Sequence, residues 1–345
     1  MASAPADTLR IASWNSGLKR DGPGLLLRDI LRNEDPQIAA ASGLISRVEA
    51  DILVVLNFDF DLDLIAADAL VRTLASPHLY PHRFALEPNS GVPTGRDVDG
   101  DGYFGDATDA HGYAPFPGQG GILVLSRWPI LRSEVTDFSN FLWAEMPENL
   151  MTAAEAARFG DVLRLHSVAA WQVPVDAPGG RFDLLVWHAG SPVFDGPEDR
   201  NGRRNDDENS FWSALLSGRL PFAAPTRPFI LAGSANLDPF DGQGRQDRWR
   251  AFLEDPQVQD VRPATSDQEP EPVGQSPDHE GDPDQDTADW KEEGGPGNLR
   301  VQYVLPSAHW QVARSGIAWP DPEGSRRQDG SVRSRHGMVW MDLRR

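Results

Sequence analysis

Residues 50–61 read ADILVVLNFDFD, and this stretch decides the fold class. The part from Asp51 to Leu56 is apolar after its first residue, whereas a strand with one face in water alternates polar and apolar side chains. A strand of this kind is buried on both faces, which places its sheet between other layers. Six further runs have strand character. They are Leu9–Ser13, Gly121–Ser126, Phe182–His188, Phe229–Gly233, Val301–Leu305 and Met338–Leu343.

Four segments between these strands carry the apolar spacing of amphipathic helices. They are Leu25–Arg32, Leu62–Leu74, Asn209–Leu216 and Arg245–Leu253. Helices with one apolar face belong on the outside of such sheets, so the pattern predicts an α/β fold with four layers, α/β/β/α, around two mostly antiparallel sheets. We expect residues 1–345 to form a single domain, with long loops at 89–119 and 264–298.

Composition excludes several classes of protein. Hydrophobic residues make up 39% of the 345 residues, which is enough for a sizeable core. The formal net charge of −20 opposes binding to duplex nucleic acid, because such binding relies on neutralising phosphates. Cysteine is absent, which removes disulfides, a thiol nucleophile and thiolate metal sites. We also expect no membrane span, since no apolar run reaches about 18 residues.

The start of the chain bears on its compartment. It lacks the charged and apolar regions of a signal peptide. Ala2, Ser3 and Ala4 nevertheless resemble the residues that follow a small-residue cleavage site. We therefore expect a mature protein exported to the periplasm or the extracellular space, with the cytoplasm as the alternative.

Residues 97–103, DVDGDGY, have the spacing that opens a calcium loop, in which oxygens at positions one, three, five and seven converge on one ion. The twelfth position is Thr108 instead of the bidentate Glu of an EF-hand. A calcium ion here would stabilise the loop and perform no chemistry, and the alternative is a solvated acidic turn. The candidate ligands are Asp97, Asp99, Asp101, Tyr103, Asp106 and Asp109.

Seven motifs follow one another in a distinctive order: LRIASWN, ADILVVLNFDFD, GQGGILVLSRWPI, PVFDGPEDRNGRRN, LAGSANLDPFDG, LRVQYVLPS and SRHGMVWMDL. In this order the chain resembles the endonuclease/exonuclease/phosphatase superfamily over nearly its whole length, and most closely a bacterial, often exported branch. The resemblance implies a two-sheet sandwich with its site at one end of the sheets. It also implies hydrolysis of phosphoester bonds with Mg²⁺ or a similar ion.

The resemblance implies that four site residues are retained: Asn15, His188, Asn236 and His336. Asn15 matches the family residue that contacts metal or phosphate, and His188 matches the histidine that hydrogen-bonds the phosphate. Asn236 matches the asparagine that orients the attacking water. For a single Asn or His, a structural role in a turn or at a strand end is the alternative.

Four family acids are replaced, by Asn57, Ser234, Gln302 and Arg335. The resemblance places Asn57 where the metal-binding Glu belongs, and an amide ligates Mg²⁺ weakly and brings no charge. Ser234 stands for the Asp that activates water, and a hydroxyl is a far weaker base. Gln302 and Arg335 stand for acids beside the catalytic histidine. A site in which three acids become neutral and one becomes a cation should prefer an anion, or nothing, so catalytic Mg²⁺ or Mn²⁺ is not expected.

Three functions are compatible with these substitutions. The main prediction is a pseudoenzyme, retained as a binding or assembly protein for a protein partner or a small anionic ligand. The first alternative is an active phosphodiesterase, phosphatase or nuclease with relocated acids, for which residues 267–289 offer nine acidic residues and no Lys or Arg. The second alternative is an anion- or nucleotide-binding protein in which Arg335 fills the metal position, helped by Arg203 and Arg204.

Overall fold

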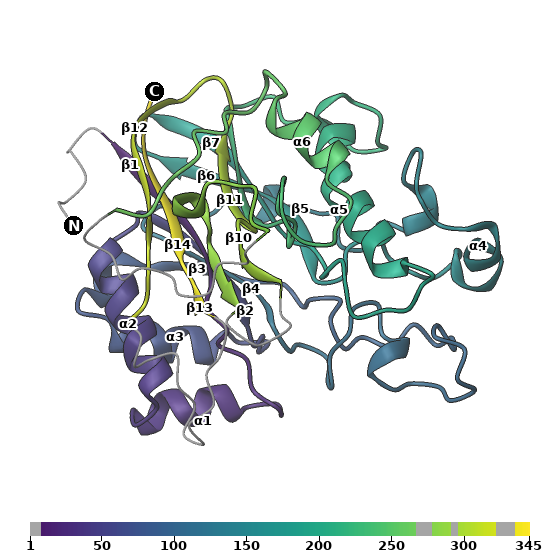
Figure 1. The fold of residues 1–345 in the computed structure, drawn as a ribbon. Helices are drawn as coiled ribbons and strands as arrows, with labels where there is room; N and C mark the ends of the chain where they lie inside the picture. The colour runs from purple at the N-terminus through teal and green to yellow at the C-terminus, as the bar shows by residue number, and fades with distance from the viewer. Residues whose placement is uncertain (1–7, 267–277, 291–295, 322–334) are drawn as a thin grey trace.

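The computed structural model describes residues 8–266, 278–290, 296–321 and 335–345, and only the backbone of Arg335. Two sheets pack face to face near the middle of the molecule, and helices cover the outer face of each (Figure 1). This arrangement confirms the predicted four-layer α/β/β/α sandwich. Among the described helices, none is both long and apolar enough to cross a bilayer.

The first sheet has the strand order β12-β14-β1-β2-β4-β3. Its strands β1 and β2 are parallel, and the other neighbouring pairs are antiparallel. The strands are β1 (Leu9–Asn15), β2 (Ile52–Phe58), β3 (His82–Phe84), β4 (Gly121–Ser126), β12 (Gln311–Ala318) and β14 (Met338–Arg344). The helices on its outer face are α1 (Leu25–Arg32), α2 (Pro36–Val48) and α3 (Ile65–Thr73).

The second sheet has the order β11-β8-β7-β6-β5, with β7 and β8 parallel. Its strands are β5 (Thr136–Asp137), β6 (Ala169–Ala177), β7 (Gly180–His188), β8 (Phe229–Ser234) and β11 (Gln302–Pro306). Helices α5 (Arg200–Leu216) and α6 (Asp247–Leu253) cover its outer face, and α4 (Ala153–Phe159) lies beyond them (Figure 1). A small third sheet joins β10 (Gly297–Leu299), β9 (Ala288–Trp290) and β13 (Arg335–His336). Short 3₁₀ helices are η1 (Pro77–Leu79), η2 (Ala107–Asp109), η3 (Arg132–Glu134), η4 (Trp143–Glu145) and η5 (Pro283–Gln285).

Strand β2 shows why the fold has four layers. Ile52, Val54 and Leu56 pack into the cluster between the two sheets. Leu53 and Val55 point the other way and pack against the helices. Because both faces of β2 are buried, the strand needs no polar alternation, as its sequence indicated.

Some elements differ from the sequence predictions. Helix α5 begins at Arg200 instead of Asn209, because its first residues are polar but buried. The predicted 264–298 loop contains β9 and the start of β10. Helix α2 was not predicted, although Asp35 caps it by accepting a hydrogen bond from the backbone N–H of Gln37.

Candidate functional site

Strand register places the predicted site residues at one end of the sandwich. His188 on β7 lies opposite Ser234 on β8, and Ser234 lies opposite Gln302 on β11. Each of the three residues has, two positions away on its own strand, a residue that packs between the sheets: Val186, Ala232 or Val304. Because side chains alternate along a strand, the three site residues also point to the face between the sheets. Asn15 lies four positions after Ile11 on β1, so its side chain points to the same face as the inward-facing Ile11. It therefore faces the three residues of the second sheet.

Four of the predicted positions form a continuous hydrogen-bonded chain, which we call the amide centre: Asn57, Asn15, Gln302 and His336. The side-chain Nδ2 of Asn57 donates to Oδ1 of Asn15 over 2.9 Å. The backbone N–H of Asn15 donates to Oε1 of Gln302 over 3.0 Å. Nε2 of Gln302 lies 2.9 Å from Nδ1 of His336. The structure therefore brings together residues from four separate parts of the sequence.

The amide centre fixes the tautomer of His336. A backbone N–H is always a donor, so the atom of Gln302 that faces Asn15 must be its oxygen. The other side-chain atom of Gln302 is then an NH₂ group, which donates to Nδ1 of His336. Nδ1 is an acceptor in this arrangement, so neutral His336 carries its proton on Nε2.

Asn57 reaches the centre through a distorted strand end. Its backbone has φ 55°, and the β2–β4 register shifts between Leu56 and Phe58. Asn tolerates this left-handed conformation better than most residues. The neighbouring Gly120 is required as well, because a Cβ there would lie 2.9 Å from Oδ1 of Asn57. The GQGG motif is thus explained by packing against this strand end.

The side chains of Ser234 and Asn236, at the end of β8 and just after it, form hydrogen bonds with the backbone of neighbouring strand ends. The Ser234 hydroxyl donates to the carbonyl of Val301 over 3.1 Å and accepts from the backbone N–H of Asn236 over 3.2 Å. Nδ2 of Asn236 donates to the carbonyl of Ala189 over 2.7 Å. Both side chains therefore shape the strand ends around His188.

The two histidines are neutral near physiological pH. Burial, followed by the charge of Lys19 and the proximity of His336, lowers the pKa of His188 to about 3. Burial lowers the pKa of His336 to about 4. Nδ1 of His188 is buried and has no hydrogen-bond partner in the described part of the chain.

A cavity of about 780 Å³, here called the central cavity, shares Asn57 with the amide centre. His188 and Asn236 line the same cavity, as do Arg204 of the predicted anion site and Asp99 of the predicted calcium loop. Two exposed aromatic residues, Phe194 and Tyr113, also line it, and sequence reasoning missed both. The signal for Phe194 was present, because a large apolar residue within the Gly-, Pro- and Asp-rich motif PVFDGPEDRNG has no regular structure to bury it.

The arginines of helix α5 stabilise the fold. Arg203 forms a buried ion pair with Glu155, with a 2.7 Å separation between nitrogen and oxygen. Arg204 donates to the backbone carbonyls of Leu165, His111 and Arg164. Both guanidinium groups therefore have partners within the protein, and the anion-binding role of Arg203 and Arg204 stays a prediction. The side chain of Arg335 lies outside the described residues.

Helix α5 also explains why the motif DRNGRRN is polar and yet buried. Arg248 of α6 pairs with Asp206 and Asp207. The carboxylate of Glu208 is fully buried and accepts hydrogen bonds from the backbone N–H groups of Ser167 and Gly190. We call these pairs, with Arg203–Glu155, the α5 network. It holds the loop after β7, and therefore the wall of the central cavity, in place.

Other acids near the site have structural partners. Asp59 accepts the backbone N–H groups of Arg20 and Gly120. Asp61 accepts those of Ile65 and Ala66 at the start of α3. These contacts indicate a structural role for the loop that follows β2.

The described part of the second acidic segment, residues 278–289, contributes nothing to the central cavity. His279 there lies between two carboxylates, with its ring nitrogens 3.4 Å from Asp241 and 3.5 Å from Asp286. Residues 267–277 lie outside the described residues. The segment does adjoin the amide centre, because Ala288 and Asp289 of β9 pair with His336 and Arg335 of β13.

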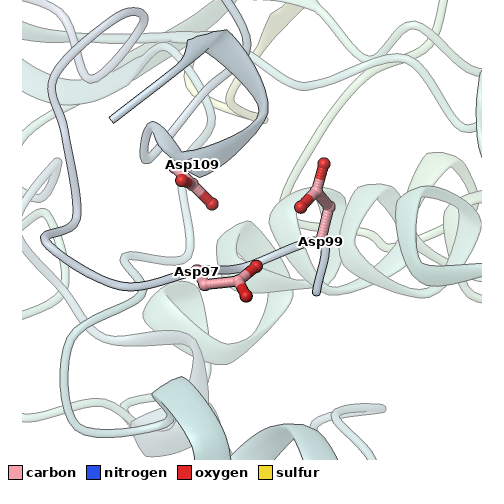
Figure 2. Close-up of side chains that lie close together, drawn as sticks. All are labelled: Asp97, Asp99 and Asp109. Carbon is pink, nitrogen blue, oxygen red and sulfur yellow. The ribbon is translucent and has the colours of Figure 1, made fainter. Parts of the chain in front are cut away.

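The predicted calcium loop gathers its carboxylates. Asp97, Asp99 and Asp109 bring one oxygen each to within 4.8 Å of the others, and Figure 2 shows these three side chains around a common space. Asp99, Asp101 and Asp106 form a second group of this kind. Tyr103, which the pattern assigns a backbone ligand, has an exposed side chain. Asp99 also lines the central cavity, so the loop and the cavity adjoin.

Comparisons with known proteins agree with this geometry. The sequence profile of the Endonuclease/Exonuclease/phosphatase family matches residues 12–329. No curated protein matches the chain. An endonuclease/exonuclease/phosphatase structure from Beutenbergia cavernae DSM 12333 is 18% identical, with a TM-score of 0.57 over 98% of this chain and 72% of that one. Sphingomyelinase C from Streptomyces griseocarneus is 16% identical, with a TM-score of 0.51 over 97% of this chain and 99% of that one.

At these identities the structural likeness shows a shared fold alone. The family profile goes further, because it spans most of the chain and includes Asn15, Asn57, His188, Ser234 and Gln302 of the site. The chain therefore belongs to the endonuclease/exonuclease/phosphatase family, and within that family its polar centre is built from amides.

Proposed function

We propose that this chain is a ligand-binding member of the family that has lost metal-dependent phosphoester hydrolysis. The observation that carries the proposal is the chain of hydrogen bonds from Asn15 through Gln302 to His336. The family resemblance implies a carboxylate beside this histidine, and here an amide takes its place. A carboxylate holds the histidine proton on Nδ1, whereas the amide holds it on Nε2.

The proton position matters because a general base needs a free lone pair that faces the substrate. A carboxylate beside Nδ1 accepts a hydrogen bond from Nδ1–H and leaves Nε2 as the base. Here Gln302 donates to Nδ1, so Nε2 of His336 carries the proton. His336 then acts as a hydrogen-bond donor. The pKa of about 4 keeps the ring neutral at pH 7, which also removes it as a general acid.

Metal binding is disfavoured for a separate reason. Mg²⁺ binds through carboxylates and water in near-octahedral geometry and loses its hydration shell reluctantly. The amide centre contains two asparagines, one glutamine and one histidine, and none of them carries a negative charge. Nδ2 of Asn57, a group with no lone pair to offer, already points at Asn15.

A cavity persists beside this centre, which favours binding over a purely structural role. Its volume of about 780 Å³ lies in the range of small-molecule sites. His188, Asn57 and Asn236 give it donors and acceptors in fixed positions. We therefore place ligand binding in the central cavity, and we treat a protein partner as the less supported alternative.

The test uses the full chain and a restored variant. Hydrolysis of bis(p-nitrophenyl) phosphate and p-nitrophenyl phosphate is measured with Mg²⁺ and Mn²⁺, and metal binding is measured by calorimetry. The restored variant carries Asn57→Asp, Ser234→Asp, Gln302→Asp and Arg335→Asp. Asp is chosen at position 57 because it tolerates the left-handed backbone there. We expect no turnover by the unmodified chain and tighter Mn²⁺ binding by the restored variant.

Metal binding at the acidic loop would confuse this result, so both proteins are also measured with Asp99→Asn and Asp109→Asn in the loop. Metal-dependent turnover by the unmodified chain that His336→Gln abolishes would overturn the proposal and support the active hydrolase. Calorimetric binding of inorganic phosphate that Arg335→Gln abolishes would instead favour the anion-binding alternative.

We also propose that residues 97–109 bind Ca²⁺. The two groups of converging carboxylates support this, together with the calcium-loop spacing of their sequence. An ion bound only by the folded state stabilises it by about 2.7 kcal/mol at 100 times its Kd. We expect Ca²⁺ to raise the melting temperature of the chain and Asp99→Asn to cancel the rise. An equal rise with both proteins would contradict this site.

A further inference from the structure

Phe194 is an unusual residue in the wall of the central cavity. Its side chain is 91% exposed, more than any other large hydrophobic residue in the described chain. Its backbone has φ 72°, a left-handed conformation that is a genuine outlier for a bulky residue. Strain of this kind persists only where the surrounding structure imposes it, and it clusters at functional sites.

The start of helix α5 imposes this conformation. Nδ2 of Asn201 donates to the carbonyl of Val193, the residue before Phe194, over 2.9 Å. The backbone N–H of Asn201 donates to the carboxylate of Asp195, the residue after it, over 2.6 Å. One residue therefore holds both neighbours of Phe194, and the ring is presented to the cavity by a fixed scaffold.

The rest of the wall indicates what the ring meets. Tyr113, a second aromatic residue, is 74% exposed and lines the same cavity. Within the described chain, neither Phe194 nor Tyr113 makes a contact with another aromatic ring. Both faces of these rings are therefore open to a flat, weakly polar ligand surface.

Charge does not favour a phosphorylated ligand. The wall contains four carboxylates, from Asp99, Asp195, Glu198 and Glu208, and three cationic side chains, from Lys19, Arg200 and Arg204. Two of these cations have partners in the protein, since Arg200 donates to Glu155 and Arg204 to backbone carbonyls. A phosphorylated ligand would therefore meet a wall with no excess of positive charge, in a protein whose net charge is −20.

A neutral sugar satisfies all of these constraints. One face of a pyranose ring presents C–H groups that pack on an aromatic ring, and its hydroxyls both donate and accept hydrogen bonds. The amide of Asn57, the ring of His188 and the carboxylate of Glu198 supply matching partners in the wall. We propose that the central cavity binds a neutral carbohydrate stacked on Phe194. This inference rests on the proposed binding function and names its ligand class.

The test is saturation-transfer NMR on the full chain with cellotriose, maltotriose and chitotriose, each at about 5 mM, because single stacked sugars bind in the millimolar range. We expect transfer to the ring C–H protons of at least one trisaccharide. Phe194→Ala should weaken that binding about tenfold, and Phe194→Trp should preserve it. Phe104→Ala is the matched control, since Phe104 is 73% exposed but does not line the cavity.

Three results would overturn the carbohydrate assignment. The first is absence of transfer to all three sugars. The second is equal weakening by Phe194→Ala and Phe104→Ala. The third is Phe194-dependent binding of AMP or choline in place of any sugar. None of these affects the proposed loss of hydrolysis, which the phosphoesterase assay measures independently.

Discussion

The α5 network and the amide centre lie on opposite faces of the second sheet, and they treat charge in opposite ways. The α5 network keeps buried ions, including Arg203–Glu155 and Arg248–Asp206, and gives each a partner. In the amide centre, by contrast, Asn15, Gln302 and His336 are buried, and the hydrogen-bonded side chains that form it are amides and one imidazole. The contrast shows where this fold depends on charge. In the α5 network each charge is buried beside a partner, whereas amides and one imidazole form the strand-end site within the same fold.

The largest expected effect is the loss of stability when an ion pair of the α5 network is broken. Arg203→Ala removes the closer of the two arginines that pair with the buried carboxylate of Glu155 and leaves Arg200 at 3.2 Å, so we expect the free energy of unfolding to fall by about 3 kcal/mol. Urea denaturation measures the change. Arg96→Ala is the control, because the exposed Arg96–Asp161 pair should contribute less than about 1 kcal/mol. Equal losses of unfolding free energy in the two variants would show that the buried Arg203–Glu155 pair contributes no more than an exposed ion pair.

The second prediction concerns Asp286, an acid close to the amide centre. The next residue, Thr287, accepts a hydrogen bond from the backbone N–H of Gln302. Burial, followed by repulsion from Asp238 and Asp241, raises the pKa of Asp286 to about 8. A carboxyl whose folded pKa is raised stabilises the fold below its unfolded pKa, and this stability is lost as pH rises through about 8.

Four buried histidines act in the opposite direction. Their pKa values fall to about 3 or 4, so their contribution is complete above pH 6.5 and is lost as pH falls; they are His111, His166, His188 and His336. Between pH 6.5 and 8, Asp286 therefore dominates this set, and we expect about 2 kcal/mol of stability to be lost. Asp286→Asn should flatten that decline in urea titrations. An unchanged slope would show that Asp286 is not the group responsible.

The third prediction concerns a carboxylate introduced at one position of the amide centre, residue 302. In Gln302→Asp a carboxylate faces Nδ1 of His336, so the proton should move from Nε2 to Nδ1. The pKa of His336 should rise by at least about 1, because the new charge favours the imidazolium form. Imidazole ¹⁵N chemical shifts report both changes, and Gln302→Glu tests whether the shorter side chain matters. A tautomer that stays the same in Gln302→Asp would contradict the assignment of the Gln302 amide.

The smallest expected effect concerns Phe194, which belongs to neither region. Phe194→Gly removes a side chain from a left-handed backbone, and we expect a gain of about 0.5 kcal/mol in stability despite the greater freedom of Gly in the unfolded chain. Phe194→Ala keeps the unfavourable backbone and serves as the comparison. If thermal denaturation ranks the Ala variant above the Gly variant, the backbone at this position carries no strain.

The parts of the fold that sequence could predict are those with a clear apolar pattern. Strands such as β4 are apolar throughout, and Gly121–Ser126 was predicted with its observed bounds. The site residues could be predicted because they end such strands and match family motifs. His188, Ser234 and Gln302 then fall into one row through strand pairing alone.

The remaining parts depend on contacts that leave no pattern in the sequence. The first half of α5 is buried by ion pairs and amide hydrogen bonds, so residues 200–208 give no apolar face to detect. Strand β9 lies in an acidic stretch whose composition indicates a loop. The roles of Arg203 and Arg204 were assigned from clustered charge, while their partners Glu155 and Leu165 lie about forty residues away in the chain.

The left-handed backbone at Asn57 has a consequence for the history of the protein. A reversion to the Glu of active relatives would place that residue in a conformation costing roughly 1–2 kcal/mol. The reverted carboxylate would also arrive alone, with Ser234 and Gln302 still neutral. Under the proposed loss of hydrolysis, a single reversion would therefore cost stability at position 57 without restoring the other acids. We expect a return to hydrolysis to need several of these positions to change together.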